Sequence, residues 1–315
     1  MTLTVTAPLL RSDERFNAFE RVWQRRTLYL FLLPFAVLSI VFGVWPIAQS
    51  LYVAFTESYT ALSPNPKFVG FENFQTILSD PMFLSSMWRT VAFTALSVVL
   101  NLAVAMGLAL LLAHPLLSAG RTWFKLAIFL PVITPDVAGY IVWKWMFNQD
   151  FGVVNAVLLN LGLPTFSGVT QPGSAFLTLL TVEMWCHVGL YTLIFLTNLQ
   201  LLDRSLSESA EIDGASAWQR FRYVTLPQLR PAIAINGVYA LIEFLKTFTI
   251  VVVITRGGPN FSTNFVSYYA YTKFDSAQYG EATAMATVLF VAVAVCAVGL
   301  LWFINRGDYR NKAAR

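Results

Sequence analysis

Six apolar runs, each long enough to cross a lipid bilayer, constrain this chain more than any other feature of its sequence. The hydrocarbon core of a bilayer is about 30 Å thick, so a spanning helix needs about 20 predominantly apolar residues. Only 12% of the 315 residues are charged, whereas a soluble domain carries about 25%. The sequence therefore predicts an all-α, polytopic membrane protein with six transmembrane helices at residues 28–53, 90–112, 124–147, 174–199, 232–254 and 282–304.

Lysine and arginine residues are distributed unevenly between the segments that connect these runs. With both termini in the cytoplasm, fifteen fall in cytoplasmic segments, four in outer loops and two inside runs. This asymmetry follows the positive-inside rule. It predicts a cytoplasmic N-terminal tail at residues 1–27, a transmembrane domain at 28–304 and a cytoplasmic C-terminal tail at 305–315. It also accounts for the net charge of +4 without a basic patch, so no nucleic-acid binding is expected.

A polar segment at residues 205–227 separates the fourth and fifth apolar runs. Ser205 and Ser216 are each followed three residues later by Glu208 and Gln219, which is the spacing of a capping box at a helix N-terminus. Gly214 lies between them, where a helix can end in a left-handed turn. The pattern predicts two short helices that meet at an angle and end at Pro227. A structured segment of this kind indicates a docking surface, and the alternative is an ordinary interfacial loop.

The same segment resembles the EAA loop of ABC-importer permeases. It matches that family's pattern at Glu208, Ala210, Gly214, Val224, Leu226 and Pro227, and it departs from the pattern at Ser209, where the family has alanine. In the family this loop is the coupling helix, which sits in a cleft of the ATP-hydrolysing subunit. The resemblance implies coupling to an ATPase through Glu208, Ser209, Ala210, Asp213, Gly214, Ala215, Leu226 and Pro227.

Two further stretches are similar to carbohydrate permeases of this family. Phe129-Leu130-Pro131 and residues 143–152 resemble the third-span region of those permeases. Phe244 to Thr255, followed by Arg256 to Pro259, resembles the fifth span and outer loop of their first permease subunit. The resemblance covers residues 28–304. It implies the fold of a type I ABC importer in its six-span form, located in the bacterial inner membrane and transporting a sugar or sugar-like solute. It also implies a heterodimer with a second permease, two ATPase subunits that bind ATP and Mg, and an external solute-binding protein, with no cofactor in this chain.

Polar side chains follow one face of the fourth run and one face of the fifth. At 100° per residue, the first face carries Glu183, His187, Tyr191 and Asn198, and the second carries Asn236, Tyr239, Glu243, Lys246 and Thr247. Ionisable groups at membrane depth are costly and usually functional. We predict that the two faces line a shared substrate pathway. The alternatives are an ion pair that only joins two spans, for Glu243 and Lys246, and an interhelical hydrogen bond, for His187.

Two other intramembrane polar residues are expected to be structural. Asp136 follows Pro131 and Pro135, so it is predicted to satisfy backbone groups that a broken helix leaves free. Lys144 lies near the outer end of the third run and is predicted to extend its ammonium toward the membrane surface.

Several functional classes lack their sequence signatures. The chain has no G-x-x-x-x-G-K-[ST] phosphate loop, so it is not expected to hydrolyse ATP. The sequence contains no H-E-x-x-H pattern and no cluster of Cys and His, so no metal site is expected. It also has no nucleophile with an orienting partner, so no catalytic residues are expected. The rival hypotheses are a stand-alone secondary transporter, with Glu183, His187 or Glu243 as a proton relay, and a non-transport scaffold.

Overall fold

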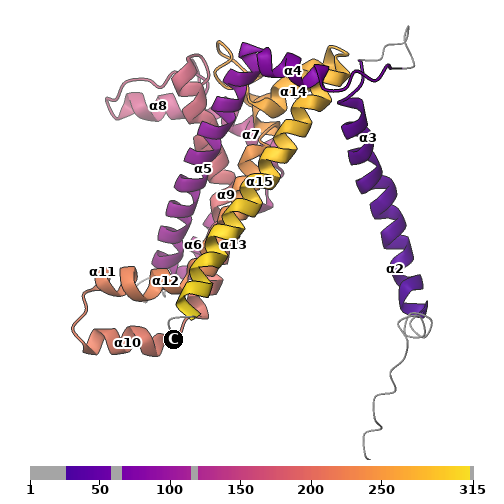
Figure 1. Ribbon diagram of the computed structural model, residues 1–315. Helices are drawn as coiled ribbons and strands as arrows, with labels where there is room; N and C mark the ends of the chain where they lie inside the picture. Colours follow the sequence, from indigo (N-terminus) through magenta and orange to yellow (C-terminus); the bar gives the residue numbers. More distant parts are fainter. Residues whose placement is uncertain (1–25, 58–65, 115–119, 313–315) are drawn as a thin grey trace, which may run out of the picture. The chain divides into compact units, whose positions relative to one another are not determined.

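The computed structural model of the chain describes residues 26–57, 66–114 and 120–312. They form two compact units, one ending at Tyr52 and the other beginning at Val53 (Figure 1). The predicted cytoplasmic tail at residues 1–27 lies outside the described residues except for its last two positions. Among the described residues every regular element is a helix, and the one extended pairing is an isolated bridge between Thr56 and Phe68. The all-α prediction is confirmed for this part of the chain.

The described part of the first unit is one helical run made of α2 (Arg26–Ser39), the π-helical turn η1 (Ile40–Val44) and α3 (Trp45–Val53), of which the last residue belongs to the second unit. In a regular α-helix the ring of Pro46 would clash with the carbonyl four residues earlier. The wider π turn lies immediately before it and relieves this clash. Residues 30–53 are long and apolar enough to cross a membrane, and none of their apolar stretch is buried within the chain. The predicted first span is therefore confirmed as a membrane-length helix with a fully exposed apolar surface.

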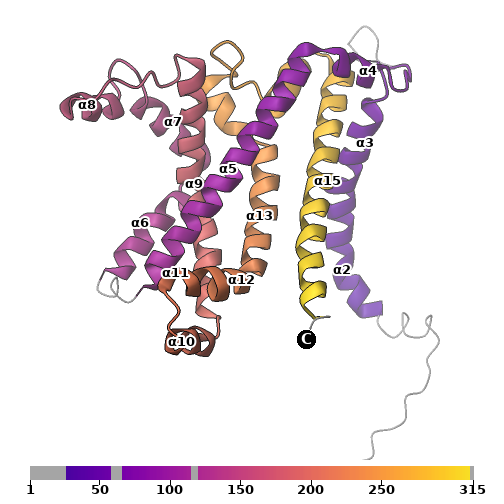
Figure 2. The same ribbon diagram turned by 60° about the vertical axis from the view of Figure 1, so that its left-hand side comes forward.

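The second unit is built on four long helices. They are α5 (Pro81–Ala113), α9 (Pro172–Gln200), α13 (Arg230–Leu245) and α15 (Tyr279–Lys312). Helix α5 contacts α9 and α13, and α13 also contacts α15 (Figure 2). Helix α5 begins nine residues earlier than the predicted 90–112 run, because Asp80 caps its N-terminus through the Met82 N–H at 2.9 Å and Pro81 occupies its first turn.

The third predicted span, residues 124–147, is not one straight helix. It is divided into α6 (Arg121–Ile133) and α7 (Asp136–Met146), whose axes differ by 104°. Thr134 precedes Pro135 and has φ −73° and ψ 130°, the extended conformation that a following proline favours. Four described helices qualify as membrane spans by length and composition, or five if this bent pair is one span.

The fifth predicted span, residues 232–254, is interrupted as well. Helix α13 ends at Leu245, and the chain resumes as the π-helical turn η4 (Val251–Thr255), which Arg256 ends in the left-handed conformation at φ +51°. Eight of the nine residues from Thr247 to Thr255 are β-branched, which weakens their preference for a regular helix. Lys144 Nζ donates to the carbonyl oxygen of Val253 at 2.9 Å. This lysine therefore satisfies a carbonyl of the irregular turn, and its predicted extension toward the membrane surface stays a prediction.

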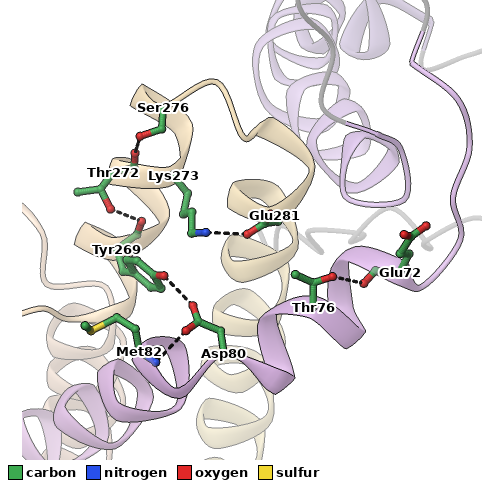
Figure 3. Close-up of polar contacts among 9 residues, drawn as sticks. All are labelled: Glu72, Thr76, Asp80, Met82, Tyr269, Thr272, Lys273, Ser276 and Glu281. Carbon is green, nitrogen blue, oxygen red and sulfur yellow. Dashed lines mark hydrogen bonds and ion pairs between the residues drawn. The ribbon is translucent and has the colours of Figure 1, made fainter.

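Short helices occupy one end of the second unit. These are α4 (Glu72–Ser79), α8 (Val153–Asn160) and α14 (Val266–Asp275). The opposite end holds α10 (Arg204–Ile212), α11 (Ala217–Arg220) and α12 (Leu226–Gln228) (Figure 1). Asp80 accepts a hydrogen bond from the Tyr269 hydroxyl at 2.6 Å, and Lys273 pairs with Glu281 at 2.8 Å (Figure 3). Burial, followed by the contact with the Asp80 carboxylate, raises the pKa of Tyr269. These contacts hold α14 against the N-terminal ends of α5 and α15.

The main hydrophobic core lies between α5, α7, α9, α13 and η4. Phe93 from α5 packs against Phe176 and Phe265 with ring centroids 5.3 and 4.8 Å apart. Tyr191 from α9 and Phe244 from α13 are fully buried in the same cluster. This core fixes α9 against α13, so it determines where the polar faces of these two helices meet.

Candidate functional site

A cavity of about 220 Å³ lies where α7, α9 and the break after α13 meet. Five of the nine residues predicted for the substrate pathway line it, namely Glu183, His187, Glu243, Lys246 and Thr247. Helix α7 adds Asp136 and Tyr140, and the segment between α13 and η4 adds Phe248 and Thr249. The structure therefore brings together the halves of both predicted polar faces that were expected to lie toward the outside.

The first charged pair of the cavity belongs to α9. His187 Nδ1 lies 3.0 Å from Glu183 Oε2 and also 3.0 Å from the carbonyl oxygen of Glu183. The Glu183 side chain is almost completely buried, so the imidazole supplies the polar partner that a buried carboxylate requires. The contact joins residues of one helix, and the predicted alternative of an interhelical hydrogen bond for His187 is wrong.

The second charged pair lies at the end of α13. Lys246 Nζ is 3.2 Å from Glu243 Oε2, and both side chains are partly exposed to the cavity. The predicted interaction between these two residues is confirmed. Lys246 lies just beyond the last helical residue, so the break after α13 places its ammonium beside the cavity.

Four predicted pathway residues do not reach the cavity. Tyr191 and Asn236 are fully buried between α9 and α13, where Asn236 Nδ2 donates to the Tyr191 carbonyl at 3.3 Å. Asn198 Nδ2 donates within α9 to the carbonyl of Ile194 at 2.9 Å. The Tyr239 ring packs on the Tyr191 ring, with centroids 6.1 Å apart. These contacts occupy the inner halves of the two faces, so the predicted pathway is not open along its whole length.

Sequence reasoning missed two cavity residues, Asp136 and Tyr140. Both come from α7, whose direction depends on the 104° bend after Ile133. The Asp136 side chain makes no hydrogen bond or ion pair with any residue that the structure describes, and it lines the cavity. The expected structural role for Asp136 is therefore wrong. The proline-flanked break before it was a visible signal, because broken helices at membrane depth border cavities.

The predicted docking segment is an ordered helical turn at the opposite end of the unit from α4, α8 and α14 (Figure 1). Helix α10 (Arg204–Ile212) is capped by Asp203, which accepts from the Ser205 N–H at 2.9 Å. Ser205 is inside the first turn of α10, so the capping box predicted for it is wrong. Hydrogen bonds from Ser205 hold the pKa of the exposed Asp203 carboxyl below its ordinary value.

Gly214 ends α10 as predicted. Its φ is +80°, and the Ala215 N–H donates to the carbonyl of Ala210 while the Gly214 N–H donates to that of Glu211. This pair of bonds is the Schellman motif, which favours glycine at the left-handed position. No atom lies within 4 Å of the place where a Gly214 side chain would begin, so only the backbone conformation requires glycine.

The second short helix begins with the predicted capping box. The Gln219 N–H donates to Ser216 Oγ, and the Ser216 N–H donates to Gln219 Oε1, at the N-terminus of α11 (Ala217–Arg220). Arg220 also pairs with Glu211 across the turn, which fixes the angle between α10 and α11.

Pro227 does not end this segment as predicted. Helix α11 continues through the π-helical turn η3 (Phe221–Thr225) into α12 (Leu226–Gln228), and α13 follows after Leu229. Proline fits in the first turn of α12 because its missing N–H is not needed there. The fully buried Leu229 side chain fixes this junction to the core.

Several large apolar side chains of the docking segment are exposed. They are Leu206, Ile212, Trp218 and Tyr223, with Ile212 at 87% exposure. Exposed apolar groups next to charged side chains are typical of an interaction surface. Glu208, Ser209, Asp213 and Gly214 are exposed on the same segment, whereas Ala210, Ala215, Leu226 and Pro227 are partly buried.

Residues 104–307 match the family described as the inner membrane component of binding-protein-dependent transport systems. The chain belongs to this family. This inner membrane component is 31% identical over 265 residues to the trehalose/maltose transport system permease protein MalF of Thermococcus litoralis, covering 84% of this chain and 89% of that protein. It is 33% identical over 273 residues to the sn-glycerol-3-phosphate transport system permease protein UgpA of Agrobacterium fabrum, covering 84% and 90%.

Solved structures agree with this family. A chain of a bacterial ABC transporter that imports the acidic polysaccharide alginate superimposes with a TM-score of 0.80 at 23% identity, covering 91% of this chain and 98% of that chain. The inner membrane component therefore has the fold of type I ABC-importer permeases. Its relatives are permease subunits, the transmembrane components of such transporters, which is the class of protein that the EAA resemblance implied. The rival hypotheses of a stand-alone secondary transporter and a scaffold are wrong.

Proposed function

We propose that the chain is one of two different permease subunits of an ATP-driven ABC importer that carries a sugar or sugar-like solute across the bacterial inner membrane. The main support for this proposal is that the chain matches known transport permeases over most of its length. Their names assign them to transport of trehalose/maltose, sulfoquinovosyl glycerol and sn-glycerol-3-phosphate. All three are polyhydroxylated solutes, and the cavity offers carboxylates, hydroxyls and aromatic rings that suit such molecules.

The proposed topology has six spans with both termini in the cytoplasm. The bent pair α6–α7 and the run from α13 through η4 each cross the membrane as an interrupted span. Irregular backbone is tolerated at membrane depth where it is buried in protein or lines a cavity. Both interruptions border the cavity described above, which supports this assignment. The tails at 1–27 and 305–315 then lie on the side where most lysines and arginines occur.

The proposed partners are a second permease, two copies of an ATPase subunit that bind ATP and Mg, and an external solute-binding protein. A structure with the same fold, the bacterial alginate ABC transporter, is known in complex with its periplasmic protein carrying an alginate pentasaccharide. Residues 205–227 would meet an ATPase subunit, because they expose apolar and charged side chains on an ordered support. The coupling residues are those named above for the EAA loop, from Glu208 to Pro227.

The proposed mechanism is alternating access. ATP binding closes the ATPase pair, residues 205–227 transmit that motion, and the helices turn the cavity outward to receive solute from the binding protein. Hydrolysis returns the cavity to the inward-facing state. The substrate pathway begins at the cavity and continues past Tyr239 toward the inner end of the unit, so the pathway residues beyond the cavity act in another state of the cycle.

A pull-down from native membranes in mild detergent tests this proposal. Wild type is compared with Glu208→Lys, which inverts an exposed charge on α10, and with Glu72→Lys, which makes the same change on α4 at the opposite end of the unit. We expect wild type and Glu72→Lys to retain an ATPase subunit and Glu208→Lys to lose it. Recovery of the chain without any ATPase in all three samples would contradict the proposed assembly.

A further inference from the structure

The charges around the cavity do not balance. Three carboxylates line it, from Asp136, Glu183 and Glu243, against one ammonium from Lys246 and one imidazole from His187. With the carboxylates ionised, the cavity carries net negative charge whether His187 is neutral or protonated. Charges that face a partly enclosed cavity act more strongly on a ligand than charges in bulk water, because the local dielectric constant is lower.

Two of the three carboxylates are already paired. Glu183 contacts His187 at 3.0 Å and Glu243 contacts Lys246 at 3.2 Å. These pairs are local, since each joins residues of one helical segment. The third carboxylate, Asp136, lies on α7 and has no ion-pair or hydrogen-bond partner among the residues that the structure describes. It is therefore the group that remains free to contact a bound molecule.

Tyr140 provides a second, independent sign of a ligand. Its side chain is only 3% exposed and lines the cavity one helical turn after Asp136. Its hydroxyl makes no hydrogen bond with any described residue, and it belongs to a side chain that lines the cavity, so it is available to a molecule bound there. An unpaired hydroxyl and an unpaired carboxylate on the same face of α7 can together hold a group that donates hydrogen bonds.

We infer that this cavity selects solutes without negative charge, and that Asp136 is the residue that determines this selectivity by binding a hydrogen-bond donor of the solute. The inference deepens the proposed function, because it treats the cavity as the solute site of the importer. The donor is a hydroxyl of a neutral sugar or the ammonium of an amino sugar, and a phosphate, uronate or sulfonate is repelled. Similarity alone leaves this open, since relatives and structural neighbours are named for trehalose/maltose, for sn-glycerol-3-phosphate and for an acidic polysaccharide.

The charge of the cavity can be measured without knowing the solute. Thr249→Cys places a thiol on the cavity wall, in a background where Cys186 and Cys296 are serine. The purified, complete importer is treated in detergent with trimethylammonioethyl or sulfonatoethyl methanethiosulfonate. In either reaction the thiolate sulfur attacks the reagent, a mixed disulfide forms and methanesulfinate leaves. The ratio of the cationic to the anionic rate, divided by the same ratio for a small free thiol, reports the local potential.

We expect the cationic reagent to react faster by on the order of tenfold, and Asp136→Asn to reduce the ratio by a similar factor. The matched control Asp150→Asn removes an exposed carboxylate that does not line the cavity, and it should leave the ratio unchanged. A ratio near one, or a ratio that Asp136→Asn does not alter, would overturn the inference.

Uptake by cells with the complete importer distinguishes the two donor groups. The probes are labelled maltose, glucosamine and glycerol 3-phosphate, and Asp136→Asn should reduce uptake of the neutral or the amine-bearing solute by about tenfold, the effect of one lost charge-assisted hydrogen bond. If wild type does not take up glycerol 3-phosphate and Asp136→Asn does, the result supports repulsion of anionic solutes by the cavity. Ready uptake of glycerol 3-phosphate by wild type contradicts it. If none of the three solutes shows ATP-dependent uptake, the result counts against sugar import itself. The ratio of the cationic to the anionic reaction rate would then still test whether the cavity is negatively charged.

Discussion

Gly189→Ala should distort the solute cavity, although Gly189 is not one of the residues that line it. Gly189 lies on α9 where α6 crosses, and an added Cβ would be 2.3 Å from the carbonyl oxygen of Ile128 and 2.8 Å from Cγ2 of Val132. Ordinary contacts begin at 3.4 Å, so the two helices must separate by the difference of about 1.1 Å. The obstacle is backbone and cannot rotate away. Glycine permits this close approach, as small residues do at helix contacts in membranes.

The cost can be worked out from these distances. Overpacking of this kind costs about 1–3 kcal/mol, and alanine returns about 1 kcal/mol through its better helix propensity. The net loss is then up to about 2 kcal/mol, which corresponds to a fall of up to roughly 8 °C in melting temperature for a domain of this size. Because α7 follows α6 directly, the displacement also moves Asp136 and Tyr140 away from the cavity.

The assay combines thermal melting of the purified importer with solute uptake. We expect Gly189→Ala to lower the melting temperature and to reduce uptake by about tenfold, the effect of losing one hydrogen bond to the solute. Gly107→Ala is the matched control, because Gly107 lies inside α5 with no atom within 4 Å of its added Cβ. Wild-type melting and uptake in Gly189→Ala would refute the reasoning, since α6 could then move freely against α9.

Three further predictions concern other parts of the chain. Gly214→Val places a β-branched residue at φ +80° at a cost of about 1–2 kcal/mol, so uptake should be abolished while the solute-binding protein still docks, and normal uptake would contradict the coupling role. Glu243→Gln and Lys246→Gln should each lower uptake, and the double variant should be no better than the worse single one; recovery in the double variant would show a purely structural pair. Asn73→Ala removes hydrogen bonds of 3.0 and 2.8 Å from its amide to two backbone carbonyls, so the melting temperature should fall by an amount equivalent to about 1–3 kcal/mol, whereas Gln75→Ala on the exposed face of the same helix should not change it.

Features that depend on a few neighbouring residues could be predicted from the sequence. The left-handed turn at Gly214 and the capping box at Ser216 are made by bonds within six residues, so their local patterns were sufficient. The cap of α10 was predicted two positions late, because Asp203 competes with Ser205 for the same role and lies nearer to the end of α9. The long apolar runs gave the membrane-length helices for the simple reason that length and hydrophobicity decide insertion.

Features that depend on tertiary packing could not be predicted. The pairing of Glu243 with Lys246 follows from their spacing. Helix α13 nevertheless ends between these two residues, at Leu245. The β-branched stretch that follows is held in place by the Lys144 side chain of another helix. The inner halves of the polar faces do not line the cavity in this structure, because Asn236 and Tyr191 use their positions to join α9 to α13. The prolines before Asp136 indicate a broken helix, but the periodicity of a single run does not give the direction of α7 after the break, so it does not show that Asp136 and Tyr140 face α9 and α13.

The two interrupted spans, α6–α7 and α13–η4, were predicted as straight helices. Their interruptions suit the proposed transport cycle. The docking segment continues from α11 through η3 and α12 to one turn residue, Leu229, after which α13 begins. Helix α13 has 16 residues, so it extends about 24 Å from the buried Leu229 to Lys246 at the cavity. In the proposed cycle, this helix would carry a displacement of the docking segment to the side chains of Glu243 and Lys246. The break after Leu245 then lets this end of α13 move without moving η4, which Lys144 ties to α7. In the proposed cycle the cavity therefore changes shape at the boundary between a moving wall, α13, and a wall formed by α7 and η4.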